Sequence, residues 1–258
     1  MSMNLDLSAA FLRDAVVGFV WQHALLAVAL FFMTLGVALC VRSNMGSSVI
    51  SSLPLVFASA GADSAGVPAL TIGQYTYIMN FVLVGLQIAV LRRRFEPVQL
   101  AQLLIGFVFG ALIDLNMALT AWMECTTLPS MAVAQFAGCS VMGFGIAMEV
   151  RCGSVTMPGE GITVALSKVS SVPFARMKIA VDTTLVALAV AACFIIWGAW
   201  QWHIVGVGTI FAMVYVGYVV RRLDGHMGWF DRALAYRPGF RRYIYGLARF
   251  IYRRRQDS

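Results

Sequence analysis

Long apolar runs, separated by short polar segments, make up most of the sequence. An apolar run of about 17–25 residues is long enough to cross a bilayer as a helix. Runs of this kind predict transmembrane helices at 15–41, 71–91, 98–120, 131–150, 174–199 and 203–220. Two further apolar pieces, 47–60 and 159–170, are shorter than a full crossing and predict re-entrant or half helices. The pattern predicts an all-α polytopic membrane protein.

Two polar, glycine-containing interruptions lie between apolar runs at matching places in the two halves of the chain. The first covers residues 42–54 and the second covers residues 151–163. Each begins six residues after a glycine of the preceding apolar run, Gly36 and Gly145 respectively. In membrane proteins, broken helices at corresponding positions of two halves are the best sequence indicator of a transport site.

The arginine clusters distinguish six spans from eight. With six spans and the N-terminus inside, Arg92–Arg94, the region 151–178 and the basic tail all lie in the cytoplasm, as the positive-inside rule favours. With eight full crossings, Arg92–Arg94 and the tail would lie on opposite sides. We therefore predict six spans, with both termini cytoplasmic.

The two halves also match in their second parts. Three residue pairs fall at one offset: Asn80 and Asp182, Gly106 and Gly208, and Phe109 and Phe211. The halves are therefore predicted to be three-span repeats, 15–120 and 131–220, within a single transmembrane domain of residues 1–220. Because each repeat has an odd number of spans, the second enters from the opposite face. The prediction is a 3+3 inverted-topology repeat, with the first interruption entering from outside and the second from the cytoplasm.

Composition supports the membrane assignment and locates the basic charge. The chain is 60% hydrophobic and 12% charged, which is too apolar for a soluble domain. Residues 221–258 carry ten Lys/Arg against three Asp, while residues 1–220 balance at nine against nine. The basicity thus belongs to the tail and does not indicate nucleic-acid binding. Apolar residues from Phe240 to Ile251 follow helical spacing, so the tail is predicted to be a basic amphipathic helix on anionic lipid.

No motif of soluble-enzyme chemistry is present in the sequence. We find no nucleotide-binding loop, nucleophile elbow or HExxH pattern, and the three histidines lie far apart. The five cysteines have no metal-ligand spacing and are expected to pack as small hydrophobic residues. A disulfide between Cys40 and Cys125 on the outer side stays open. We expect neither an enzyme nor a cofactor or metal site.

The interruptions carry groups that bind ligands. The serine-rich stretch 43–52, which includes Ser47, and the turn formed by Gly159, Glu160 and Gly161 offer hydroxyls and free N–H groups. Half-helix N-termini favour anionic groups. Alternatively, both segments are aqueous loops that cover the ends of the bundle.

Asp182 is the most informative single residue. It lies about eight residues into the predicted span 174–199, where an ionisable group costs a few kcal/mol or more and marks function by default. It would suit a proton carrier or a substrate contact. Alternatively, Lys178 lies one turn earlier and neutralises it as an i,i+4 pair. Its counterpart Asn80 is neutral and can bridge helices through a hydrogen bond.

Four further charged residues are weighed in the same way. Asp114 lies in the outer third of its span, where it either pairs with Arg42 or is solvated. Arg42 and Arg151 occupy matched positions and can bind a carboxylate or phosphate. Glu149 ends its span, and charges at helix ends usually reach water, so Glu160 is the better candidate.

Several motifs together resemble a known group of proteins. They are Arg42-x-Asn44-x-Gly46-Ser47, Phe109-Gly110-x3-Asp114, Met157-Pro158-Gly159-Glu160-Gly161 and Lys178-x3-Asp182. This pattern resembles the YczE/YyaS/YitT-type bacterial integral membrane proteins over nearly all of 20–222, and the Pro-Gly-Glu-Gly stretch is similar to the DUF6198-like branch. The resemblance implies a bacterial inner-membrane protein with duplicated halves. It strengthens the case for Asp114, Glu160 and Asp182 without assigning roles.

The leading hypothesis is a secondary transporter of an unidentified small solute, with proton coupling as an option. Asp182, Glu160 and Asp114 would supply exchangeable charge, and Arg42, Asn44 and Ser47 would contact the solute from outside. The rival is a non-transporting scaffold or regulatory subunit that docks lipid or partners through its tail. A membrane-embedded enzyme acting on lipid-linked substrates has only the intramembrane carboxylates in its favour.

Overall fold

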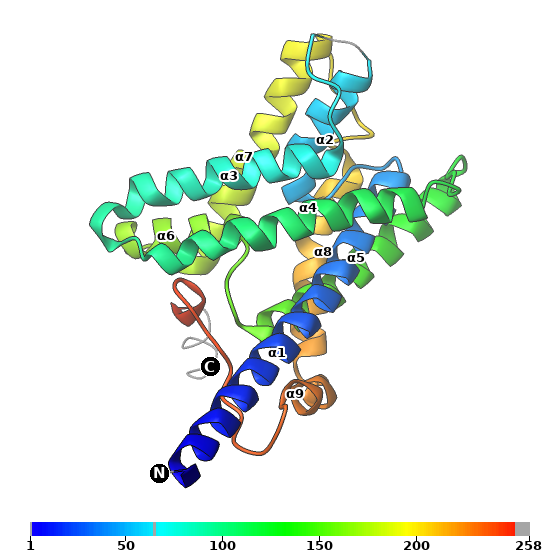
Figure 1. The fold of residues 1–258 in the computed structure, drawn as a ribbon. Helices are drawn as coiled ribbons and strands as arrows, with labels where there is room; N and C mark the ends of the chain where they lie inside the picture. The colour runs from blue at the N-terminus through cyan, green and yellow to red at the C-terminus, as the bar shows by residue number, and fades with distance from the viewer. Residues whose placement is uncertain (1, 64–65, 251–258) are drawn as a thin grey trace.

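The computed structural model describes residues 2–63 and 66–250, and this part of the chain is built from helices without a strand (Figure 1). The α helices are α1 (Ser2–Arg42), α2 (Val49–Ala62), α3 (Ile72–Leu91), α4 (Ala101–Leu119), α5 (Leu128–Cys152), α6 (Pro158–Ser170), α7 (Phe174–Trp197), α8 (Val207–Asp224) and α9 (Gly228–Leu234). Two short 3₁₀ helices, η1 (Arg92–Arg94) and η2 (Pro97–Leu100), connect α3 to α4.

Five of the described helices are long and apolar enough to cross a membrane. They lie in the segments Leu12–Arg42, Ile72–Arg94, Pro97–Leu119, Leu128–Cys152 and Phe174–Trp197. These correspond to the first five predicted spans, so a multi-pass helical membrane protein is confirmed. The sixth predicted span, α8, has 18 residues and carries three charged residues in its last turn. The count of six stays a prediction.

The two short apolar pieces of the sequence are short helices in the structure. α2 has 14 residues and α6 has 13. At 1.5 Å per residue each is about 20 Å long, which is less than the roughly 30 Å of a bilayer core. Each begins after a non-helical segment, and Pro158 occupies the first turn of α6, where a missing N–H costs no helical hydrogen bond.

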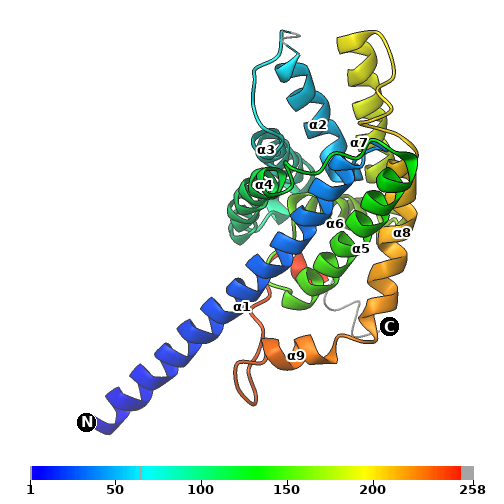
Figure 2. The same ribbon diagram turned by 90° about the vertical axis from the view of Figure 1, so that its right-hand side faces the viewer.

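α1 and α5 form the central pair, and they lie side by side in both views (Figures 1 and 2). Glycines allow their backbones to touch. A Cβ added to Gly36 would lie 2.5 Å from Met142 Cβ, and one added to Gly145 would lie 2.5 Å from the backbone nitrogen of Met33. Any side chain at either glycine would therefore force the two helices apart.

The other helices pack around this pair. α4 lies against α1 and α8 lies against α5. α3 packs on α4 and α6, and α7 packs on α2 and α6, so that α2 and α7 extend together away from the central pair (Figures 1 and 2). The membrane-length segment containing α7 is the least buried of the five.

The tail differs from the prediction of a basic amphipathic helix. Beyond α9, residues 235–247 are not helical, and helix resumes at 248–250; the rest of the predicted helix, 251–258, lies outside the described residues. The extended backbone is bound by other segments. Tyr243 donates its N–H to Gln22 Oε1 at 2.9 Å and accepts from Gln22 Nε2 at 2.9 Å. Tyr245 donates its N–H to the carbonyl of Ser154 at 2.9 Å.

We call residues 235–250 the C-terminal strap. It crosses one end of the bundle from α1 to α6 (Figure 1). Leu247, which is almost completely buried, inserts among Leu91, Val164 and Ala165. These contacts explain why the segment gives up helical hydrogen bonds, because Gln22 and Ser154 supply partners for its backbone.

The Cys40–Cys125 disulfide, which the sequence left open, is not formed in the structure. All five cysteines are free and buried. Cys40 lies against Cys139 of α5, with 3.8 Å between the two sulfur atoms. Cys125 instead belongs to the segment that connects α4 to α5. The small thiols therefore fill space in the close α1–α5 interface and in that connection.

Candidate functional site

The first turns of the short helices α2 and α6, called half helices below because each is shorter than a bilayer crossing, meet inside the bundle. A Cβ added to Gly159 would lie 2.8 Å from Ile50 Cδ1, so the Ile50 side chain rests on the Gly159 backbone. An apolar cluster around this contact joins both half helices to α3 and α7: Val49, Ile50, Met79, Leu83, Ile162, Leu166, Val181 and Leu185. The predicted site residue Gly159 is thus the point at which α2 and α6 touch.

Gly161 lies beneath a buried pair of glutamines. Gln87 Nε2 donates to Gln102 Oε1 at 3.2 Å, and Gln102 Nε2 donates to Gln87 Oε1 at 3.1 Å. Gln87 Nε2 also donates to the Pro158 carbonyl at 3.1 Å. A Cβ on Gly161 would lie 2.9 Å from Gln87 Nε2, so glycine is needed for this pair to reach the start of α6. The sequence reasoning missed both glutamines, although each is an amide inside an apolar span.

Four charged side chains from three helices surround the start of α6. Glu160, in the first turn of α6, is half-buried and interacts electrostatically with Lys178 and Asp182 of α7. Glu149 of α5 interacts electrostatically with Glu160. Lys178 Nζ donates to Asp182 Oδ1 at 2.7 Å. Glu160 and Asp182 thus interact electrostatically, while the direct contact of Asp182 is the Lys178 ion pair of the alternative interpretation.

Glu149 contradicts the expectation that it reaches water. Only 5% of the residue is exposed, and its Oε2 has no hydrogen-bond partner among the described residues. The cause is the turn that follows. Gly153 ends α5 in the left-handed conformation, with φ of 62°, and its N–H donates to the Glu149 carbonyl. The chain then folds back toward α6, which keeps the end of α5 inside the protein.

Two other polar groups in this region lack partners. The Thr156 hydroxyl, two residues before α6, is buried and has no hydrogen-bond partner in the described part of the chain. The same is true of both amide atoms of Asn80, which lies against Gly106 of α4. Because buried polar groups are nearly always hydrogen-bonded, these two groups are exceptions within the interior of the described chain.

The first interruption is tied to the turn that precedes α8. Gly46 has φ of 118°, and a Cβ there would lie 2.6 Å from the backbone nitrogen of Gly206. The Ser47 N–H donates to the Ile204 carbonyl at 2.9 Å, and the Ser47 hydroxyl reaches the same oxygen at 3.2 Å. Ser47 is therefore occupied by a structural contact in this conformation.

Arg42 and Asn44 line a cavity of about 340 Å³ at the end of the bundle where α1 stops. The remaining lining residues are Val41, Met123, Glu124, Cys125 and Thr126. Arg42 donates one guanidinium N–H to the Met117 carbonyl at 2.8 Å, and its buried Nε has no partner among the described residues. Arg42 and Asn44 thus share one cavity, which Ser47 does not line.

Asp114 caps the start of α3. It accepts a hydrogen bond from the Thr71 hydroxyl at 2.6 Å and one from the Gly73 N–H at 2.9 Å. A carboxylate at a helix N-terminus satisfies free N–H groups and stabilises the helix dipole. The suggested pairing with Arg42 is absent from the described ion pairs, because each side chain is bound elsewhere.

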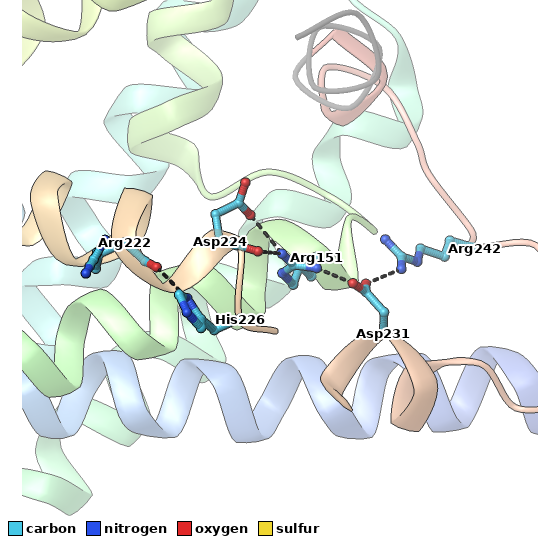
Figure 3. Close-up of polar contacts among 6 residues, drawn as sticks. All are labelled: Arg151, Arg222, Asp224, His226, Asp231 and Arg242. Carbon is cyan, nitrogen blue, oxygen red and sulfur yellow. Dashed lines mark hydrogen bonds and ion pairs between the residues drawn. The ribbon is translucent and has the colours of Figure 1, made fainter. Parts of the chain in front are cut away.

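Arg151, whose position matches that of Arg42 in the sequence, binds carboxylates of the protein itself (Figure 3). It pairs with Asp231 of α9, and its other terminal nitrogen lies 2.9 Å from Asp224 Oδ1 at the end of α8. Arg242 of the strap donates to the second oxygen of Asp231 at 2.6 Å. Arg151 therefore anchors α8, α9 and the strap to the end of α5.

Comparison with known proteins places the chain in a family. Neither the search of curated proteins nor the search of solved structures finds a match. The model of DUF6198, a family of unknown function, matches residues 20–225, which is most of the chain and includes both interruptions. On this match, the chain belongs to the DUF6198 family.

Proposed function

We propose that this protein is a secondary transporter of a small solute, built from two inverted halves (α1–α4 and α5–α8). It would lie in a bacterial inner membrane with both termini in the cytoplasm. Reciprocal contacts support the duplication. Gly36 rests on Met142 and Gly145 rests on Met33, so a glycine from each half meets a methionine of the other half, at the 109-residue spacing that relates the two interruptions. Exchanging the halves therefore maps one contact onto the other.

The packing of whole helices follows the same exchange. If α1 to α4 correspond in order to α5 to α8, the contact of α1 with α4 matches that of α5 with α8. Likewise, the contact of α3 with α6 matches that of α7 with α2, and the contact of α2 with α3 matches that of α6 with α7. The halves differ in one respect, because α3 packs closely on α4 whereas α7 extends away from α8 (Figure 2). Alternating access would exchange these two arrangements, bringing α7 onto α8 as α3 leaves α4.

The contact between Ile50 and Gly159 is the observation that carries the proposal. These two residues are also 109 positions apart, so each touches its own counterpart. In a two-fold arrangement this occurs on the axis, where inverted-repeat transporters bind their substrates. The half helices would therefore meet at the site, with Glu160 from α6 beside it.

The cavity at Arg42 and Asn44 supports a route from the outer face. Its volume of about 340 Å³ suits a small solute. The free Nε of Arg42 offers a donor to an anionic or carbonyl group of that solute. Asp114 has no place in this route, since it caps α3.

Cysteine accessibility tests the proposed architecture. Single cysteines at Asn44 and Ser170, which are both exposed, would be treated with a membrane-impermeant maleimide in intact cells and in inverted vesicles, in a protein whose native cysteines are replaced. We expect Asn44→Cys to react from outside and Ser170→Cys from the cytoplasm. Ser47→Cys and Thr156→Cys are the buried controls, and neither should react in this conformation. Reaction of both test positions from the same side would refute the inverted repeat.

The scaffold is the second candidate, and the Lys178–Asp182 ion pair favours it. A pair closed at 2.7 Å needs no ligand. A panel of small metabolites, screened by thermal stabilisation of the purified protein and then by uptake into proteoliposomes, separates the two functions. A transporter gives at least one compound that both binds and is taken up. A scaffold gives none, and loses partner binding when the strap is removed.

A further inference from the structure

The charges around α6 occur in the second half of the chain alone. By the spacing that relates the halves, the counterpart of Glu149 is Cys40 and that of Glu160 is Ser51. Lys178 and Asp182 correspond, at the offset of the later helices, to Thr76 and Asn80. All four counterparts are neutral and buried. Packing of the duplicated fold therefore does not require these charges, so they call for a separate explanation.

The charge balance leaves one carboxylate uncompensated. Asp182 is neutralised by Lys178 at 2.7 Å. Glu160 lies at the third position of α6, where the positive end of the helix dipole compensates a carboxylate. Among the residues that the structure describes, Glu149 has neither an ion-pair partner nor a helix N-terminus to compensate its charge. Only 5% of the residue is exposed, and its Oε2 has no hydrogen-bond partner in the described chain. A buried carboxylate in this situation takes up a cation.

The surroundings of the pair favour a proton over a metal ion. No group of three or more His, Cys, Asp or Glu that could hold a metal exists among the described residues. A proton needs no coordination shell, and a buried carboxylate that interacts electrostatically with a second carboxylate favours the protonated form.

The other groups that face this pair are few. The charged groups are Lys178 and Asp182 from α7 and Arg242 from the strap, which interacts electrostatically with Cys152 and also pairs with Asp231. The neutral groups are Cys152 of α5, the amides Gln87 and Gln102 from α3 and α4, and Gln22 of α1 beside the Cys152 carbonyl. Arg151 is held by Asp224 and Asp231.

We propose that Glu149 and Glu160 together hold one exchangeable proton, which is the coupling ion of the transporter. This inference rests on the proposed function and identifies its ion. Half-buried Glu160 exchanges the proton with water, and fully buried Glu149 stores it. When the proton leaves as H⁺ to water, the pair gains one negative charge. Lys178, which already interacts with Glu160, compensates that charge by moving from Asp182 toward Glu160.

Infrared spectroscopy of the purified full-length protein in nanodiscs tests this directly. A protonated buried carboxyl gives a C=O stretching band that shifts in D₂O and disappears when the group loses its proton. We expect this band in the wild-type protein at neutral pH, its loss in Glu149→Gln and in Glu160→Gln, and its retention in Glu96→Gln, a control in the exposed connection between α3 and α4. Absence of the band in wild type, or its persistence in both variants, would overturn the proposal.

A second measurement covers the case in which a variant fails to fold. A hydrophobic carbodiimide modifies protonated carboxyls in apolar surroundings, so mass spectrometry of the wild-type protein should find the label on Glu149 or Glu160. Labelling should fall about tenfold per pH unit above the midpoint of titration. Labelling that is absent or independent of pH contradicts the shared proton. These readouts do not involve a solute, so failure here leaves the accessibility test of the transporter intact, and failure of that test leaves the proton pair intact.

Discussion

Gln22 holds the C-terminal strap, and replacing it with leucine should release this segment locally. The Gln22 side chain is completely buried and makes three hydrogen bonds: to the Cys152 carbonyl at 2.7 Å, to the Tyr243 carbonyl at 2.9 Å, and from the Tyr243 N–H at 2.9 Å. Each hydrogen bond contributes about 1 kcal/mol, and the partners left behind are the buried Cys152 carbonyl and the partly buried backbone of Tyr243. Gln22→Leu should therefore cost about 3 kcal/mol in the free energy of opening the strap.

Hydrogen exchange measured by mass spectrometry reports this opening. About 3 kcal/mol corresponds to a roughly hundredfold faster exchange of the strap amides, including the Tyr245 N–H that donates to Ser154. Asp14→Asn is the matched control, because it removes the pairing of the half-exposed Asp14 with Arg237 in the same strap. Such pairs contribute about 0–1 kcal/mol, so exchange should rise less than about fivefold. Unchanged protection of Tyr245 in Gln22→Leu would refute the anchoring role.

Three further substitutions test individual contacts by thermal unfolding in detergent. Gly145→Leu should destabilise by about 3 kcal/mol because α1 leaves no space, whereas Gly85→Leu, where an added Cβ meets nothing within 4 Å, should be nearly neutral. Equal effects would contradict the close α1–α5 contact. Gly161→Ala should lower the free energy of unfolding by about 1–3 kcal/mol, because the added methyl group breaks the hydrogen bonds between Gln87 and Gln102. Gly217→Ala is its control, since an added Cβ at Gly217 meets nothing within 4 Å. Asp114→Ala should cost about 1–2 kcal/mol as a lost helix cap, and a gain in stability would argue that its charge is kept for function.

The lengths of the apolar runs carried most of the fold prediction. Five membrane-length segments and both short helices lie where the hydrophobic pattern predicted them. The reason is that the thickness of the bilayer core sets the length of an apolar helix that crosses it. The prediction of a helical tail was wrong for a physical reason. Its apolar residues do follow helical spacing. However, Gln22, more than two hundred residues away in the sequence, supplies the hydrogen bonds that the extended backbone at Tyr243 loses by leaving the helix.

The candidate site was predictable in part. The Pro-Gly-Glu-Gly stretch led to Glu160 and to the two glycines, since glycine, proline and a carboxylate in an apolar region are unusual at the level of sequence. Glu149 was undervalued because its burial depends on how the chain turns at Gly153. Arg42 and Arg151 look equivalent in sequence, yet Arg151 is held by carboxylates of α8 and α9 while Arg42 lines a cavity.

Disulfide trapping tests the meeting of the two half helices most directly. Ile50→Cys and Gly159→Cys would be combined in a protein lacking other cysteines, with a protease site inserted after Thr126 so that a disulfide alone joins the fragments. Removing the Ile50 side chain makes room for the new one at 159. The native pair Cys40 and Cys139, with sulfur atoms 3.8 Å apart, is the positive control.

The negative control combines Ile50→Cys with Ser170→Cys, at the far end of α6. If the first turns of α2 and α6 meet, oxidation in membranes should join the fragments of the 50–159 protein and leave those of the 50–170 protein separate. Separate fragments at 50–159, with the Cys40–Cys139 control joined, would contradict the meeting of the half helices.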